Sequence, residues 1–372
     1  MVGCLQCRMS RRSFIASGAF VTSITAVGGV GASAAAYGGG GPPRADSSHD
    51  ASVGLPAQDG MIDFHTHLFD EEMPTLVDPA AFGVNGAVWL AAMRSPKIHI
   101  EHMDRTGLRA HVIGVAHAVH GISWGDVERD LALYRASNDR IARDWVAAHP
   151  GRFYGAFGLP TQNIDLSIRE LERAVNVLGL SVLQISSCSA NGLYYGDPFF
   201  DPLWSAVEAL GIPLFIHPHG QSNQPPLDKF FLNVSVGQGI EEIKVMTSMI
   251  YNGVFEKFPR LKVVIAHGGG FLPHYYGRID REAVERPQTV KNLTKKPSEY
   301  LKNFYYDSCV YGPNILKTLI ENVGVDRIVL GSDYPVGEAD GLAALRATPG
   351  LSAENVRMIA ALTPARVLRR GA

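Results

Sequence analysis

Eight short apolar runs alternate along this chain with longer stretches that have helical spacing, and this alternation restricts the possible folds severely. The runs are residues 61–67, 109–115, 153–159, 181–185, 212–216, 261–266, 303–307 and 327–330. Continuous apolar runs, as opposed to alternating ones, are typical of parallel strands that helices cover. Eight such strands separated by helices predict an α/β protein with a (β/α)8 TIM barrel, occupying residues 60–372 as a single domain.

The segment between the first two predicted strands is longer than a simple strand-to-helix turn requires. Residues 68–95 contain Pro74, Pro79 and several glycines, so we expect a short, irregular insertion after strand 1 that covers the strand ends. An open doubly wound sheet is the alternative fold, but its first strand is normally followed by a glycine-rich fingerprint. This chain has His65-Thr66-His67 there. The predicted helices are residues 98–106, 126–149, 165–178 (capped by Asp165), 200–210, 240–258 and 352–369.

The N-terminus has the pattern of an export signal. Arg11 and Arg12 precede a run rich in alanine and glycine that extends to Ala36, which predicts a twin-arginine signal peptide over residues 1–36. The run holds too many Gly, Ser and Thr residues to favour a stable membrane span. Residues 37–59 are expected to form a flexible linker. The twin-arginine export machinery is therefore an expected partner, with a periplasmic or extracellular location; the alternative is an Ala-rich tail with a chance arginine pair.

Composition excludes some partners and frameworks. The formal net charge is −2 over 372 residues, so the chain has no overall basic field for nucleic acid. The four cysteines are Cys4, Cys7, Cys188 and Cys309, and only the last two follow the predicted signal. Two cysteines do not make a disulfide framework, so we expect Cys188 and Cys309 to be small buried residues.

Potential metal ligands recur at the ends of several predicted strands. His65 and His67 are two residues apart on a strand, so their side chains point to the same side. In a barrel the C-terminal strand ends open on one face, where catalytic groups gather. We therefore expect five side chains to meet there: His65, His67, His217, His267 and Asp333. The alternatives are a chance gathering of strand-end histidines and, for Asp333, a turn-capping role.

This residue set suits one divalent metal with an open position. Nitrogen ligands with one carboxylate favour zinc or a similar first-row metal. Gln184 lies on the fourth strand, where a bridging carboxylated lysine for a second metal would be needed, so a mononuclear site is predicted. The fifth histidine is then available for proton transfer. His267 is followed by three glycines, which are expected to allow close approach of a substrate.

Six motifs extend this reading beyond the single residues. They are Met61-Ile62-Asp63-Phe64-His65-Thr66-His67, Met103-Asp104-x-x-Gly107, His149-Pro150-Gly151-Arg152-Phe153, Phe215-Ile216-His217-Pro218, Ala266-His267-Gly268-Gly269-Gly270 and Gly331-Ser332-Asp333-Tyr334-Pro335. Together they resemble the metal-dependent amidohydrolase superfamily, in particular the branch of aminocarboxymuconate-semialdehyde decarboxylase and related non-oxidative decarboxylases. The resemblance covers residues 61–368, although Thr363-Pro364 stands where the family usually has Asn-Ala.

The resemblance implies roles for individual residues. His65, His67, His217 and Asp333 would bind one divalent metal, Zn²⁺ with Mn²⁺ as the alternative, and His267 would activate water or move a proton. Arg278, in Tyr276-Gly277-Arg278, matches the arginine that reaches a substrate carboxylate across a dimer interface, which implies a homodimer. Arg94 is a candidate for a substrate-selecting arginine of the first loop. Asp307 is expected to orient a ligand or His267, and His219 and His274 are expected to be structural.

The implied reaction is the removal of CO2 from a small unsaturated or aromatic carboxylic acid, by a metal-dependent carboxy-lyase. A hydrolase of an ester, lactone or amide is the alternative, and it would use the same site, with Asp333 also carrying a proton. A third hypothesis is an exported metal-binding protein without turnover. It is disfavoured because a proton carrier beside an open metal position would have no evident use.

Overall fold

The computed structural model describes residues 60–74, 85–116, 123, 125–219, 227 and 229–369. The predicted signal peptide and linker, residues 1–36 and 37–59, lie outside the described residues, as does the stretch 75–84 of the expected insertion. Every helix in the described part of the chain is too short or too polar to cross a membrane.

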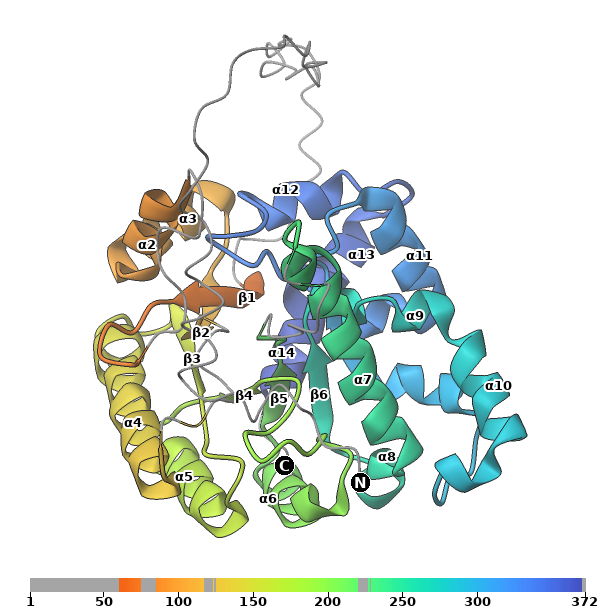
Figure 1. Ribbon diagram of the computed structural model, residues 1–372. Coiled ribbons are helices and arrows are strands. Elements are labelled where there is room, and N and C mark those ends of the chain that lie inside the picture. Colours follow the sequence, from red (N-terminus) through yellow and green to blue (C-terminus); the bar gives the residue numbers. More distant parts are fainter. Residues whose placement is uncertain are drawn as a thin grey trace, which may run out of the picture.

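Eight parallel strands follow one another in sequence order around one sheet (Figure 1). They are β1 (Ile62–Leu68), β2 (Ala110–Val115), β3 (Phe153–Phe157), β4 (Val182–Ile185), β5 (Pro213–Ile216), β6 (Lys262–Ile265), β7 (Phe304–Asp307) and β8 (Ile328–Val329). The end of the sheet returns to its beginning, because the Phe64 N–H donates to the Leu330 carbonyl at 2.7 Å and the His67 N–H donates to the Tyr334 carbonyl at 2.8 Å. The predicted (β/α)8 barrel is confirmed.

The strands are buried on both faces, which explains their continuous apolar sequences. On β6, Val263 and Ile265 pack in the core between the strands and the helices, whereas Val264 packs in a second cluster. That second cluster takes residues from seven of the eight strands, including Phe64 and Phe215, and therefore fills the barrel interior. Each fully buried side chain of this kind stabilises the fold by about 1.5–3 kcal/mol.

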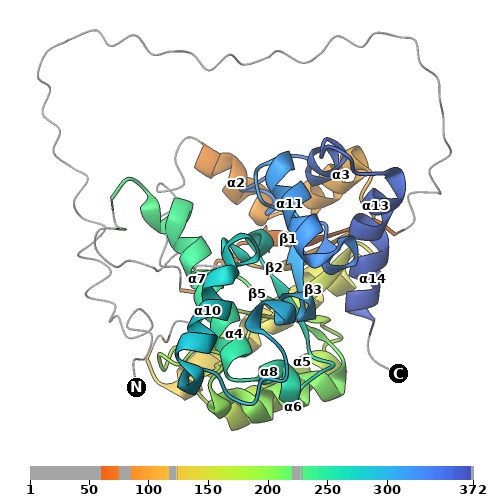
Figure 2. The same ribbon diagram turned by 90° about the vertical axis from the view of Figure 1, so that its right-hand side faces the viewer.

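Helices surround the barrel between the strands. They are α2 (Gly86–Met93), α3 (Pro96–Thr106), α4 (Val127–Arg140), α5 (Ile164–Asn176), α6 (Asp201–Leu210), α7 (Gln238–Tyr251), α8 (Val254–Lys257), α9 (Leu272–Tyr275), α10 (Gly277–Glu285), α11 (Pro313–Val323), α12 (Gly341–Arg346), α13 (Ala353–Arg357) and α14 (Thr363–Leu368). In both ribbon views α2 and α3 lie at the opposite end of the molecule from α6 and α8 (Figure 2).

The structure corrects several predicted elements. The stretch 68–95 is not irregular throughout, because α2 forms within it. The predicted helix 240–258 is two helices, since Gly253 adopts φ 65° between α7 and α8. The cap of α5 is Asn163, whose side chain accepts a hydrogen bond from the Leu166 N–H, and not Asp165, which lies within the first turn. The last predicted helix, 352–369, is interrupted by the wider π-helical turn Met358–Leu362 between α13 and α14.

Candidate metal centre

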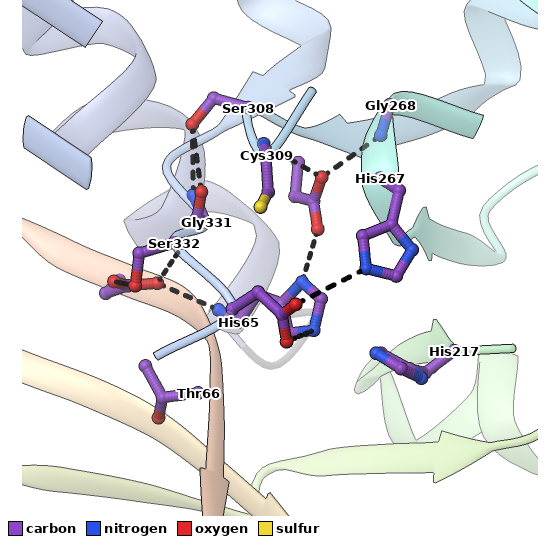
Figure 3. A network of polar contacts seen from close by, with 12 residues as sticks. His65, Thr66, His217, His267, Gly268, Ser308, Cys309, Gly331 and Ser332 are labelled. Atoms are coloured by element: carbon purple, nitrogen blue, oxygen red, sulfur yellow. Dashed lines mark hydrogen bonds and ion pairs between the residues drawn. The ribbon is translucent and has the colours of Figure 1, made fainter. Parts of the chain in front are cut away.

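The C-terminal strand ends bring the predicted ligands together (Figure 3). One ligand atom from each of four residues can be chosen so that all four atoms lie within 4.8 Å of one another; these residues are His65, His217, His267 and Asp333. His65 lies on β1, His217 directly follows β5, and His267 and Asp333 lie in the turns after β6 and β8. Among the described residues this is the one group of three or more such side chains close enough to hold a metal ion.

His67 joins this group from the same strand as His65. Its Nε2 lies 3.1 Å from the Nε2 of His65 and 2.8 Å from the Oδ1 of Asp333. The ring centroids of His67 and His217 are 5.0 Å apart. All five side chains that the sequence predicted to meet are thus gathered at one place. That His67 binds the metal while His267 carries the proton stays a prediction.

Burial and opposing charges define the electrostatics of the site. Burial works against protonation of His65, but the charge of Asp333 and hydrogen bonds to Asp307 and Asp333 outweigh it and raise the pKa of His65 to about 9. Burial would raise the pKa of Asp333, but the same pairing holds it well below its usual range. The carboxylates of Asp307 and Asp333 thus favour positive charge on the groups that face them. The donor set fits a divalent metal, which such sites bind when their imidazoles are deprotonated.

Residues behind the ligands fix their orientation. The Nδ1 of His65 donates to the Oδ2 of Asp307 at 2.6 Å, so its Nε2 faces the other ligands. The Oδ1 of Asp307 accepts hydrogen bonds from the backbone N–H groups of Gly268, at 3.1 Å, and Cys309, at 3.2 Å. The Nδ1 of His217 donates to the Pro218 carbonyl at 2.6 Å, which selects the tautomer with an accepting Nε2. Asp307 therefore contacts a candidate ligand from behind, in the manner expected of an orienting residue.

Asp63 ties β1 to the turn that carries Asp333, a role the sequence reading missed. It is fully buried, and its Oδ1 accepts the backbone N–H groups of His65 at 3.0 Å and Ser332 at 3.1 Å. The Ser332 hydroxyl donates to its other oxygen. The signal available in the sequence was an acidic residue on an otherwise apolar strand, because a buried carboxylate needs hydrogen-bond partners.

Glu242 is a second residue that sequence reading missed. It is fully buried on α7, and its Oε1 lies 2.7 Å from the Nδ1 of His267. The Nε2 of His267 faces Asp333, with 3.8 Å between it and Oδ2. Burial works against the charged imidazole, but the carboxylates of Glu242 and Asp333 outweigh it and raise the pKa of His267 well above its usual value. His267 is therefore an imidazole held between two carboxylates, which favour its protonated form.

The three glycines after His267 make room for neighbouring protein atoms, and close approach of a substrate there stays a prediction. A Cβ on Gly268 would lie 2.5 Å from the Val310 side chain. A Cβ on Gly270 would lie 2.7 Å from the Gly239 carbonyl oxygen and 2.8 Å from the Oε2 of Glu242. The glycines thus let the loop after β6 pack closely against α7, which brings Glu242 to His267.

The side chain of Gln184 is buried and packs between strands of the barrel. Its Nε2 donates to the Val115 carbonyl at 3.1 Å, and its Oε1 occupies space beside Gly114, where an added Cβ would come within 1.7 Å. The side chain thus bonds β2, which lies beyond β3 in the sheet. The sequence of β4, Val182–Ile185, holds no lysine or acidic residue, and the mononuclear site stays a prediction.

The two predicted substrate-binding arginines lie on the surface. Arg278 on α10 has a side chain 65% exposed, with its Nε 3.9 Å from the Oε1 of Glu282. Arg94 directly follows α2; its Nε lies 2.7 Å from the Oε1 of Glu71 and its guanidinium stands over the ring of Phe69. The ion pairs and the ring contact named for these two arginines involve none of the five site residues. Binding of substrate by either arginine stays a prediction.

The remaining candidates lie at the edge of the site or outside it. His219 is buried and its backbone N–H donates to Glu241 at 3.0 Å, whereas His274 on α9 is exposed. Cys309 is a buried free thiol. Cys188 is also buried, with its Sγ 3.9 Å from the Nε2 of His219.

Comparison with known proteins decides the family. A family model described as amidohydrolase matches residues 62–370. The chain belongs to this amidohydrolase family. Among its relatives, the 2-amino-3-carboxymuconate-6-semialdehyde decarboxylase of Dictyostelium discoideum is 32% identical over 294 residues, which are 74% of this chain and 81% of that protein. The gamma-resorcylate decarboxylase of a Polaromonas species is 31% identical over 308 residues, covering 76% and 90% of the two chains.

A solved relative adds a metal to the comparison. The crystal structure of a dihydroxybenzoic acid decarboxylase from a Polaromonas species, with bound manganese and the inhibitor 2-nitroresorcinol, matches this amidohydrolase with a TM-score of 0.71 and 26% identity. The match covers 83% of this chain and 96% of that one. The predicted resemblance to the decarboxylase branch of the superfamily is confirmed.

Proposed function

We propose that this protein is a metal-dependent non-oxidative decarboxylase that acts on a small unsaturated or aromatic carboxylic acid. The observation that carries the proposal is the gathering of ligand atoms from His65, His217, His267 and Asp333 within 4.8 Å, at strand ends of the barrel. The decarboxylases among the relatives support the same reaction class.

The metal would be held by His65, His67, His217 and Asp333. Nitrogen and oxygen donors suit Zn²⁺, and the manganese in the Polaromonas relative supports Mn²⁺ as the alternative. When bound, a divalent metal polarises the oxygen atoms of a substrate or acidifies a water molecule.

His267 moves the proton in this proposal. The Nδ1 of His267 is held by Glu242 at 2.7 Å, so its Nε2 is the nitrogen directed toward the ligand group. Decarboxylation replaces a carboxylate with hydrogen: Nε2 gives its proton to the substrate carbon, the bond to the carboxylate carbon breaks, its electron pair stays on the substrate, and CO2 leaves. His267 then takes a new proton from solvent. General acid catalysis of this kind contributes about 10²–10⁴-fold to a rate.

The surface beside Arg278 supports the proposed homodimer. Phe271, Tyr275 and Tyr276 precede Arg278 on the same short segment and are 48%, 66% and 39% exposed. Exposed aromatic groups around an arginine suit an interface between proteins. In this proposal Arg278 of one protomer reaches the substrate that is bound by the other protomer. Arg94 helps to select the substrate of its own protomer. Light scattering of wild-type protein and Arg278→Glu tests the dimer, which should weaken in the variant; a monomeric wild type would contradict it.

Export by the twin-arginine route is a separate proposal, supported by Arg11 and Arg12 before the apolar run. Fractionation of cells that express wild-type protein and the double variant Arg11→Lys/Arg12→Lys tests it. Only the wild type should leave the cytoplasm. Equal distribution of both proteins would contradict the proposal.

The reaction is tested by incubating metal-loaded protein with panels of carboxylated phenols and of lactones and esters. Release of CO2 from the first panel is expected, and it should be lost in His267→Gln while the metal content is kept. Release of acid from the second panel without CO2 would instead identify a hydrolase. The absence of any turnover by the wild type would leave metal binding as its function and contradict the proposal.

A further inference from the structure

Tyr311 has an uncommon backbone conformation at the edge of the candidate metal centre. It follows β7 and adopts φ 53°, in the left-handed region that favours glycine. Bulky residues occupy this region only where the surrounding structure enforces it, and such positions cluster at functional sites. The reason that this backbone conformation is kept lies in the contacts of the Tyr311 side chain.

That contact is with the carboxylate of Asp333. The Tyr311 hydroxyl donates to Oδ2 at 3.0 Å. The other oxygen, Oδ1, lies 2.8 Å from the Nε2 of His67 and 3.3 Å from the Nε2 of His65. The two oxygens of Asp333 thus have different environments: Oδ1 faces His65 and His67, whereas Oδ2 faces the tyrosine hydroxyl and, at 3.8 Å, the Nε2 of His267.

Gly337 provides space for this arrangement. A Cβ at this position would lie 2.7 Å from the Cβ of Asp333 and 3.0 Å from the Tyr311 hydroxyl oxygen. A larger residue would push these two side chains. Tyr311 itself is 61% exposed, so burial of its ring contributes little to the stability of this conformation. Packing of the ring alone therefore does not account for the strained position, and the hydrogen bond to Asp333 does.

We propose that Tyr311 is a positioning residue for Asp333, which it holds so that only Oδ1 is presented to the metal. With Oδ2 engaged by the hydroxyl, the carboxylate cannot rotate to offer both oxygens, and Oδ2 stays 3.8 Å from the Nε2 of His267. Without the hydroxyl, Oδ2 is released toward either the metal or the proton of His267. Both changes disturb the site, the first at the metal and the second at the proton carrier.

Tyr311→Phe tests this role because it removes one oxygen atom and leaves the ring. Titration of metal-free protein with Mn²⁺ alone is the first measurement, and the affinity is expected to fall by about 10–100-fold, the usual cost of losing a partner of a metal ligand. With a turned-over substrate, kcat is expected to fall while KM changes little, since Tyr311 acts through Asp333. Tyr305→Phe is the matched control: it removes a hydroxyl from another tyrosine, on β7, whose ring lies beneath the Arg327 guanidinium, and should change neither quantity.

The outcomes separate this inference from the proposed function on which its kinetic part rests. A Tyr311→Phe variant that binds Mn²⁺ as tightly as the wild type overturns the positioning role, whatever the reaction is. A wild type that binds Mn²⁺ but releases no CO2 overturns the decarboxylase, while a weaker affinity of Tyr311→Phe still supports the role of Tyr311. Equal unfolding temperatures of the metal-free wild type and variant are expected; a large drop in the variant would show a structural role instead.

Discussion

The carboxylate of Glu242 on α7 holds the imidazole of His267 with 2.7 Å between Oε1 and Nδ1. Both partners are buried or nearly so, and the positive φ of the glycines after His267 lets the loop come this close to the helix. A carboxylate on one ring nitrogen fixes the orientation of the other. The relationship therefore directs the Nε2 of His267 at the ligand group, which is the geometry that a proton carrier needs.

Glu242→Gln should separate proton transfer from metal binding. The amide keeps the shape of the side chain but loses the charge that favours a protonated His267, so kcat is expected to fall by about 10–100-fold. The metal content should stay at the wild-type level. Steady-state kinetics with metal analysis measures both, and Glu285→Gln on the surface of α10 is the control. An unchanged kcat would show that Glu242 does not act through His267.

Asp307→Asn should weaken metal binding more than it weakens folding. The Oδ2 of Asp307 accepts the Nδ1 proton of His65 at 2.6 Å, and an asparagine amide can place a donor there instead. Loss of such a partner usually costs about 10–100-fold in metal affinity. Titration of metal-free protein with Mn²⁺ measures the affinity. A wild-type affinity in the variant would exclude Asp307 from the support of His65.

Buried histidines next to the site should make the fold sensitive to acid. The Nδ1 atoms of His99 and His111 lie 3.0 Å apart, and both side chains are fully buried. Burial lowers the pKa of His99 to about 3 and holds the pKa of His111 well below its usual value. The unfolded chain binds these protons near pH 6.5, so their contribution to stability is present above that pH and decreases as the pH falls from about 6.5 toward 3.

His99→Gln tests this dependence because glutamine can still hydrogen-bond His111 but does not titrate. Urea unfolding of both proteins between pH 7.5 and 4.5 gives the free energy of unfolding at each pH. Each histidine that stays neutral contributes a slope of about 1.4 kcal/mol per pH unit below its unfolded pKa. In the variant, the free energy of unfolding should therefore fall less steeply with decreasing pH, by about 1.4 kcal/mol per pH unit. Parallel profiles for the wild type and the variant would contradict the assignment.

The strand ends could be read from the sequence, whereas the residues behind them could not. His65, His67, His217, His267 and Asp333 were predictable because parallel strands of a barrel all end on one face, so their order in the sequence fixes where they meet. Glu242 and Tyr311 come from a helix and a loop. Glu242 approaches the site because α7 packs closely against Gly270, and Tyr311 approaches it beside Gly337. The spacing of apolar residues in the sequence does not predict such close contacts.

The prediction missed α2 and joined α7 to α8, in both cases because apolar spacing alone was not informative. The residues of α2, Gly86–Met93, are nearly all apolar, so the segment has no polar face and shows no helical period. For α7 and α8 the hydrophobic spacing continues across Gly253, and only the left-handed backbone there ends the first helix. Periodicity identifies helices with two different faces and does not detect changes of direction between them.

Metal content is the measurement that tests the central claim most directly. The account predicts about one divalent metal ion per chain in the purified wild type, as in mononuclear sites of this donor set. The double variant His65→Ala/His67→Ala should hold none, while His274→Ala, on the exposed face of α9, should retain the wild-type amount. A wild type that takes up no divalent metal, or a double variant that still binds it in full, would contradict the claim that these strand-end side chains form a metal centre.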